Sequence, residues 1–135
     1  MIRYMLDTNI VSFAMRSRPQ AVLDRLAASR PDEVCISAVT LAELCFGAAR
    51  SSASRRYGNL IDRFVDRVRS MPFDAAAATS YGRVRAALEA SGSRIGDLDM
   101  LIAGHALSLQ TTLVTNNRAE FDRVAGLGVE DWSVP

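Results

Sequence analysis

Short apolar runs alternate with longer helical periodicities along this chain, and that alternation most constrains its fold. The runs that predict strands cover about residues 2–6, 33–37, 71–73, 111–116 and 129–132. The segments that predict helices begin after residues 7–9 and then cover 19–30, 38–50, 53–69, 74–90, 97–109 and 118–124. Strands separated by helices pair in parallel through right-handed crossovers. The sequence therefore predicts a three-layer α/β/α fold with a mostly parallel central sheet of about five strands.

Length and composition favour one globular domain that covers residues 1–135. The chain is 49% hydrophobic, and no polar tract is long enough to divide it. No apolar run approaches the roughly 20 residues of a membrane helix, and no secretory leader is visible. Cys35 and Cys45 match no metal-ligand spacing, so we expect two reduced, buried thiols in a cytoplasmic protein.

All sixteen basic residues are arginine, and the missing lysine excludes a P-loop nucleotidase, whose phosphate site requires one. The arginines cluster in two groups, Arg50, Arg55 and Arg56, then Arg63, Arg67 and Arg69. Such groups could hold phosphates or form an ordinary solvated helix face, and the sequence leaves both interpretations open.

Acidic residues follow the predicted strands at the edge where parallel sheets bind ligands. Asp7 ends the first strand, and Glu43 lies in the first turns of the helix after the second. Asp97 and Asp99 open a later helix, and the fourth strand runs into Asn117. The sequence thus predicts that carboxylates from three distant segments meet at one rim of the sheet.

Each of these acids also has a purely structural interpretation. Asp7 and Asp97 could cap the helices that follow them, and Thr40 with Glu43 fits a capping box. Asp99 could be favoured by the helix dipole. Helix caps, however, have no reason to lie together at one edge of the sheet, so the acids taken together favour a functional site.

Converging carboxylates require a counter-charge. Two of them about 4 Å apart repel by roughly 4 kcal/mol at an effective dielectric of 20. They would either hold protons or bind a hard divalent cation, and oxygen ligands suit Mg²⁺ or Mn²⁺. Metal-assisted phosphodiester hydrolysis is the chemistry of such a site. His105 is the only histidine, no G-x-S-x-G motif is present, and we expect that histidine in the core rather than in a triad.

Four segments together resemble the PIN-domain ribonucleases, and more narrowly the VapC toxins of bacterial toxin–antitoxin pairs. They are "MLDTN" at 5–9, "TLAEL" at 40–44, "IGDLDMLIAGHA" at 95–106 and "LVTNNRAEF" at 113–121. The resemblance covers almost the whole chain, and the closing "VEDW" is also similar.

The resemblance implies a Mg²⁺- or Mn²⁺-dependent, site-specific endoribonuclease. Asp7, Glu43 and Asp99 match the family's metal-binding acids, and Asn117 stands where many PIN domains carry an aspartate. Asp7 and Asp99 would bind the metal, and Glu43 would orient or deprotonate a water. Asn117 would position that water or the scissile phosphate. Asp97 falls where many relatives are uncharged, which favours a cap.

The resemblance also implies partners. They are an RNA substrate, notably tRNA near the anticodon, a VapB-like antitoxin and a second copy in a homodimer. The apolar helices at 19–29 and 53–69 are candidate docking surfaces, although core packing explains them equally well. The alternative is a catalytically inactive PIN-like binding module, which would be expected to lack one of the three acids. A receiver domain would need a rim lysine, and a haloacid-dehalogenase-like phosphatase would need D-x-D where Asn9 follows Asp7.

Overall fold

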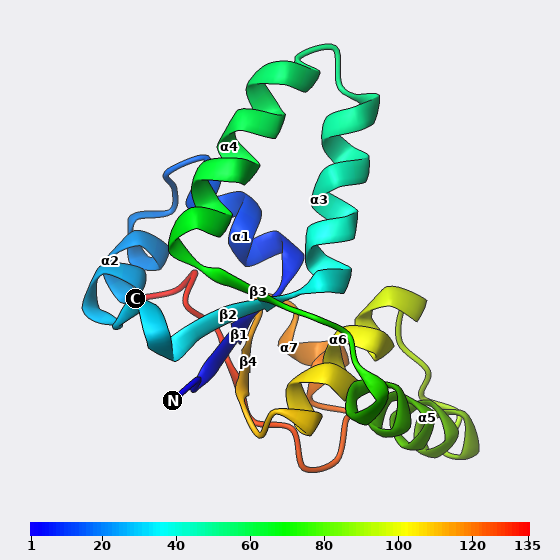
Figure 1. Cartoon of the computed structure of the whole chain (residues 1–135). Helices are drawn as coiled ribbons and strands as arrows, with labels where there is room; N and C mark the ends of the chain where they lie inside the picture. The colour runs from blue at the N-terminus through cyan, green and yellow to red at the C-terminus, as the bar shows by residue number, and fades with distance from the viewer.

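Five short parallel strands form the centre of the computed structural model, which describes all 135 residues. The strands are β1 (Tyr4–Leu6), β2 (Val34–Ser37), β3 (Arg69–Met71), β4 (Thr112–Val114) and β5 (Val129–Glu130). They lie in the order β3-β2-β1-β4-β5, and every pairing is parallel. The predicted parallel sheet is confirmed, and β1, which leads to Asp7, is its central strand (Figure 1).

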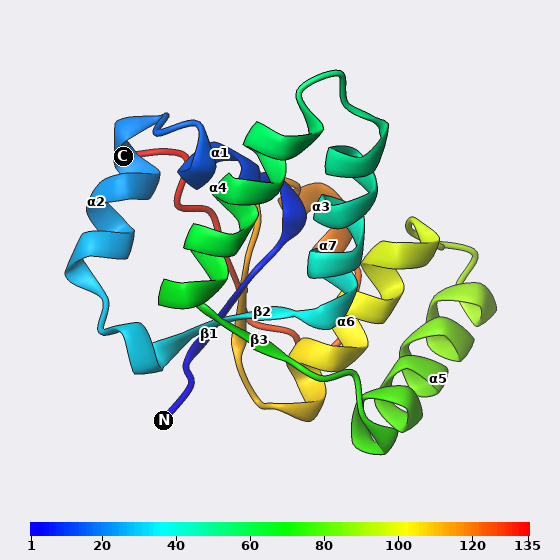
Figure 2. The same cartoon turned by 45° about the horizontal axis from the view of Figure 1, so that its top comes forward.

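Helices cover both faces of this sheet and complete the three layers. They are α1 (Thr8–Met15), α2 (Gln20–Ala28), α3 (Ala38–Arg50), α4 (Ser54–Arg67), α5 (Ala75–Ala90), α6 (Asp97–Ser108) and α7 (Arg118–Phe121). Helices α1, α2 and α4 lie on one side of the sheet, and α5 and α6 lie on the other (Figures 1 and 2). Helices α3 and α4 form a hairpin whose tip stands away from the sheet.

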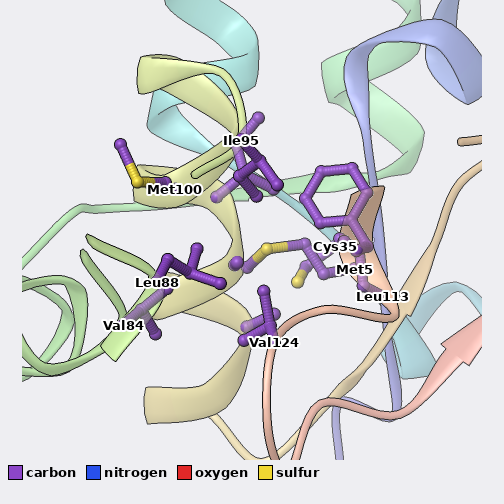
Figure 3. Close-up of a cluster of buried hydrophobic side chains, with 12 residues drawn as sticks. Met5, Cys35, Val84, Leu88, Ile95, Met100, Leu113 and Val124 are labelled. Carbon is purple, nitrogen blue, oxygen red and sulfur yellow. The ribbon is translucent and has the colours of Figure 1, made fainter. Parts of the chain in front are cut away.

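Successive side chains along each strand point to opposite faces of the sheet, so the hydrophobic core has two parts. The aligned residues Met5, Cys35 and Leu113 face α5 and α6 and pack with Leu88 and Met100 (Figure 3). The next residues along each strand point the other way, toward α1, α2 and α4: Leu6, Ile36 and Val114. Helices cover both faces of the sheet, as is usual for parallel sheets. The side chains packed on each face hold β1, β2 and β4 in one register.

Helices α5 and α6 pack closely because Gly104 has no side chain. A Cβ added to Gly104 would lie 2.6 Å from both Cα and N of Tyr81 on α5. A Cβ added to Gly47 or Gly82 would meet nothing within 4 Å, so of these helical glycines only Gly104 is required for close packing. The contact holds α6, and hence the acids in its first turn, against the rest of this layer.

Two local expectations are wrong. Strand β3 ends at Met71, two residues earlier than predicted, and Pro72, which has no N–H to donate to a strand ladder, lies beyond it. Cys45 is exposed on α3, whereas Cys35 is buried, and burial raises the pKa of the Cys35 thiol to about 12. None of the helices has both the length and the apolar character to cross a bilayer.

Candidate active site

Asp7 lies at the carboxyl end of β1 and is only 5% exposed. Its backbone N–H donates to the carbonyl of Val114 at 2.9 Å, which continues the pairing of β1 with β4. Its Oδ1 accepts a hydrogen bond from the N–H of Ile10 at 3.0 Å and so caps α1. The cap uses one oxygen, so Asp7 can cap a helix and still present a carboxylate to the sheet edge.

Glu43 is brought to Asp7 by the turn from β2 into α3. Ser37 caps α3 by accepting from the N–H of Val39 at 3.0 Å. Thr40 is therefore inside the helix, and the alternative in which Thr40 and Glu43 form a capping box is wrong. The hydroxyl of Thr8 instead donates to Glu43 Oε1 at 2.6 Å, a bond between α1 and α3.

Asp99 lies in the first turn of α6 and is half-buried, whereas its neighbour Asp97 is exposed. Gly96 occupies the capping position of α6, so Asp97 is not the cap that the sequence favoured. Asp97 forms an ion pair with Arg94, and its side chain is 75% exposed. Of the two acids, only Asp99 faces the other carboxylates.

Asn117 follows β4, and its contacts reveal an acid that the sequence analysis missed. Its backbone N–H donates to the Thr115 hydroxyl at 2.9 Å, and its Nδ2 donates to Oε2 of Glu120 at 2.8 Å. Glu120 in turn lies close enough to Asp99 to raise the pKa of that carboxyl. Glu120 follows Val114, the end of β4, by six residues, just as Glu43 follows Ser37, the end of β2, by six. That shared spacing is the pattern that would have found it.

The pKa shifts of Asp7 and Asp99 reflect both burial and the neighbouring acids. Burial raises the pKa of Asp99 to about 7, helped by the charge and hydrogen bond of Glu120 and then by the charges of Asp7 and Glu43. Burial likewise raises the pKa of Asp7 to about 6, against hydrogen bonds from Thr115 and Ile10 that lower it. Glu43 adds to this rise. Burial is thus the main influence on Asp7 and Asp99, and Glu43 and Glu120 add negative charge at the same edge.

The donor set fits a hard divalent cation but does not form a ready-made cage. The polar side chains named above offer carboxylate, amide and hydroxyl oxygens, and the repulsion between the carboxylates is what a cation would relieve. No group of three acidic, histidine or cysteine side chains is already arranged to enclose an ion. This arrangement suits Mg²⁺, which commonly takes one or two protein carboxylates and keeps several waters.

His105 is a structural residue, as the sequence analysis expected. It is 1% exposed, its Nδ1 lies 2.8 Å from the Ser37 hydroxyl, and its ring meets Phe73 edge-on at 5.3 Å. Burial lowers the pKa of the His105 imidazole, so the neutral ring is favoured. Through Ser37, the histidine stabilises the turn between β2 and α3, and it is not part of the acidic cluster.

Comparison with known proteins shows a match along nearly the whole chain. The PIN domain family model matches residues 4–127. The tRNA(fMet)-specific endonuclease VapC of Shigella flexneri is 45% identical over 133 residues, which are 98% of this chain and 100% of that protein.

Solved structures agree with the sequence match. In the DNA-bound VapBC complex from Salmonella typhimurium, the matching chain has a TM-score of 0.93 at 38% identity, with 98% of this chain and 99% of that one covered. VapBC-1 from nontypeable Haemophilus influenzae gives a TM-score of 0.89 at 36% identity, with the same coverage of both chains.

Proposed function

Because the chain belongs to the PIN-domain family, and within it to the VapC ribonucleases, we propose that it is a metal-dependent, site-specific endoribonuclease of a toxin–antitoxin pair. Residues 1–135 act as one domain. The observation that supports the proposal most is that Glu43 and Glu120 contribute to raising the pKa values of Asp7 and Asp99 at one partly buried edge of the sheet. None of the three acids expected from the family motifs is missing, which disfavours an inactive binding module.

Asp7 and Asp99 would hold a Mg²⁺ or Mn²⁺ ion, with Glu120 beside Asp99 contributing further negative charge. When bound, the ion would polarise the phosphoryl oxygen and stabilise the charge that develops during cleavage. Glu43 orients the attacking water and accepts its proton. The Thr8 hydroxyl already bonds Oε1 of Glu43, so Oε2 is the atom assigned to that proton.

Hydrolysis joins the water oxygen to phosphorus and breaks the bond to the 3′ oxygen, which leaves a 5′-phosphate and a 3′-hydroxyl. Asn117 acts in this scheme as a positioning residue. Its Nδ2 holds Glu120, and its backbone is fixed by Thr115. We therefore assign it to the orientation of Glu120 rather than to direct contact with the phosphate.

The substrate proposed for this enzyme is tRNA(fMet), cut once in its anticodon arm. The name of the 45% identical Shigella protein supports this choice. Single-stranded loops are also where proteins read RNA sequence, because their bases can be splayed out.

The protein partners proposed are a VapB-like antitoxin and a second copy of the chain, in the cytoplasm. The similarity to chains of solved VapBC complexes supports the antitoxin. Apolar side chains of α2 and α4, including Leu23, Leu26 and Phe64, line a pocket between these helices. This pocket makes them the preferred docking surface for an antitoxin segment.

Expression of the chain alone in bacteria tests the proposal. We expect growth arrest and one dominant new 5′ end in the anticodon arm of tRNA(fMet). The purified protein should reproduce that cut with Mn²⁺ or Mg²⁺ and lose it with EDTA. Asp7→Asn and Asp99→Asn should abolish cleavage while the protein remains folded. Intact RNA and unchanged growth despite folded protein would favour the binding-only alternative.

A further inference from the structure

Two bulky apolar side chains are exposed next to the acidic cluster. Four large hydrophobic residues of the chain are exposed, and two of them, Met1 and Val134, lie at the termini. The other two are Phe46, 65% exposed and three residues after Glu43, and Leu98, 46% exposed and directly before Asp99. Exposed apolar groups beside a site indicate a ligand with apolar surface of its own.

Phe46 lies on a strip of α3 that leads away from the cluster. Glu43, Phe46 and Arg50 are spaced by three and four residues, so their side chains share one side of the helix. The Arg50 guanidinium lies 5.2 Å from the centroid of the Phe46 ring. The strip therefore presents a carboxylate, then an aromatic ring about 4.5 Å further along the axis, then a cation.

The α3–α4 tip beyond Arg50 carries arginines and no acidic residues. Residues 44–61 contain no aspartate or glutamate. A hollow joins the end of α1 to the start of α4, with Arg16, Arg18 and Arg56 in its lining. None of Arg16, Arg18, Arg50, Arg55 and Arg56 forms an ion pair, although six other arginines of the chain do. Unpaired arginines on such a surface are suited to phosphates.

We propose that the Phe46 ring stacks on an unpaired base of the RNA next to the cleaved phosphodiester, and that Arg50 holds a phosphate beside that base. The α3–α4 tip with Arg55 and Arg56 then follows the backbone further from the cut. This inference rests on the proposed function, because it names how that enzyme recognises its substrate. Every base offers a π face to an aromatic ring, and arginine suits the backbone.

Charge favours RNA over other occupants of this strip. In a two-fold dimer through the same face, Arg50 could meet Glu43 of the second copy, but Arg55 and Arg56 would find no acid in residues 44–61. RNA matches both features of the strip, because its flat bases can stack on the Phe46 ring and its anionic backbone can pair with Arg50. An antitoxin segment on the strip is the competing outcome of the test.

Binding is measured in the cleavage-dead Asp7→Asn protein, so that the RNA stays intact. The probe is a hairpin with the anticodon-arm sequence of tRNA(fMet), in which 2-aminopurine replaces one loop base at a time. We expect fluorescence quenching at one position, which is lost in Phe46→Ala and Phe46→Leu and kept in Phe46→Tyr. Affinity should fall about ten- to hundredfold in Phe46→Ala. The leucine variant separates ring stacking from simple apolar contact.

Arginine variants test the second half of the inference. Arg50→Ala should weaken hairpin binding about tenfold and reduce its salt dependence. The matched control is Arg83→Ala, an exposed and unpaired arginine on α5 on the opposite side of the sheet, which should change neither quantity. Equal effects of the two variants would mean that only net charge matters, and would overturn the role of Arg50.

The outcomes separate this inference from the proposed function. If the parent protein cuts tRNA(fMet) and Phe46→Ala binds the hairpin and cuts equally well, the stacking role is wrong and the nuclease assignment stands. If Phe46→Ala instead changes only the oligomeric state or antitoxin affinity, the strip is a protein interface and the inference fails. If the parent cuts no RNA, the proposed function itself fails.

Discussion

The hydroxyl of Thr8 donates a hydrogen bond of 2.6 Å to the carboxylate of Glu43, across 35 positions of sequence. Thr8 begins α1 directly after Asp7, so the same turn that places one acid at the sheet edge also orients another. The bond occupies Oε1 of Glu43 and fixes the rotamer of a long side chain that would otherwise be mobile. Thr8 is thus a positioning residue for the proposed proton acceptor.

Thr8→Val tests this relationship, because valine keeps the shape of threonine and removes the hydroxyl. We expect the single-turnover cleavage rate to fall about tenfold, the scale of an imperfectly placed general base. Thr8→Ser should retain most of the rate, because serine restores the donor. A valine variant as fast as the parent would show that the bond has no part in catalysis.

Charge on Asp7 should destabilise the protein when no divalent ion is bound. The folded-state pKa, about 6, lies above the ordinary value of 3.8, so the folded protein binds more protons between these pH values. The free energy of unfolding therefore falls as pH rises from about 4 to about 6 and does not recover above it. Asp7→Asn should raise the free energy of unfolding by about 3 kcal/mol at pH 8 and change it little at pH 4, as measured by urea unfolding with EDTA.

Asp7→Ala is the control for this prediction, because it removes the helix cap together with the charge. Asparagine caps helices as well as aspartate does, whereas alanine does not, so Asp7→Ala should be about 1 kcal/mol less stable than Asp7→Asn. Added Mn²⁺ should stabilise the parent and neither variant. An Asp7→Asn protein less stable than the parent at pH 8 would contradict the electrostatic argument.

Glu120 should contribute to metal affinity although the sequence analysis did not identify it. Glu120→Gln removes a charge beside Asp99 with little change in shape, and we expect Mn²⁺ binding about ten- to hundredfold weaker by calorimetry. Asn117→Ala, which frees Glu120 to move, should show a smaller loss in the same direction. Asp122→Asn is the matched control, because that acid is exposed and paired with Arg118, and it should bind Mn²⁺ like the parent.

Much of the fold could be predicted because burial leaves a clear periodic pattern. The apolar spacing predicts helix 38–50, and α3 runs from Ala38 to Arg50 because Ser37 ends a buried strand and caps the helix at once. Strand β3 was harder, because it lies at the sheet edge and begins with the exposed Arg69, so its pattern is not apolar. Cys45 lies in an apolar segment but on the outer side of α3, which local sequence does not reveal.

The candidate site could be predicted in part, for a geometric reason. The edge rule for parallel sheets leads from strand ends to Asp7 and Glu43. Asp99 opens α6, which follows helix α5 rather than a strand, so its assignment depended on the resemblance to the family motif. Glu120 was missed because it lies in the four-residue helix α7, and a glutamate in such a short helix is typical of an ordinary protein surface. Its role becomes visible only through tertiary contacts with Asn117 and Asp99.

Two glycines in neighbouring helices should respond to alanine with opposite signs. In Gly104→Ala, the new Cβ would lie 2.6 Å from the Tyr81 backbone, so α5 and α6 must separate, and we expect a loss of about 2–3 kcal/mol. In Gly82→Ala, the new Cβ meets nothing within 4 Å, and the better helix propensity of alanine should add about 0.5–1 kcal/mol. Thermal and urea unfolding of the two variants measures both changes. Similar effects in the two would contradict the assignment of Gly104 as the contact that lets α5 and α6 approach.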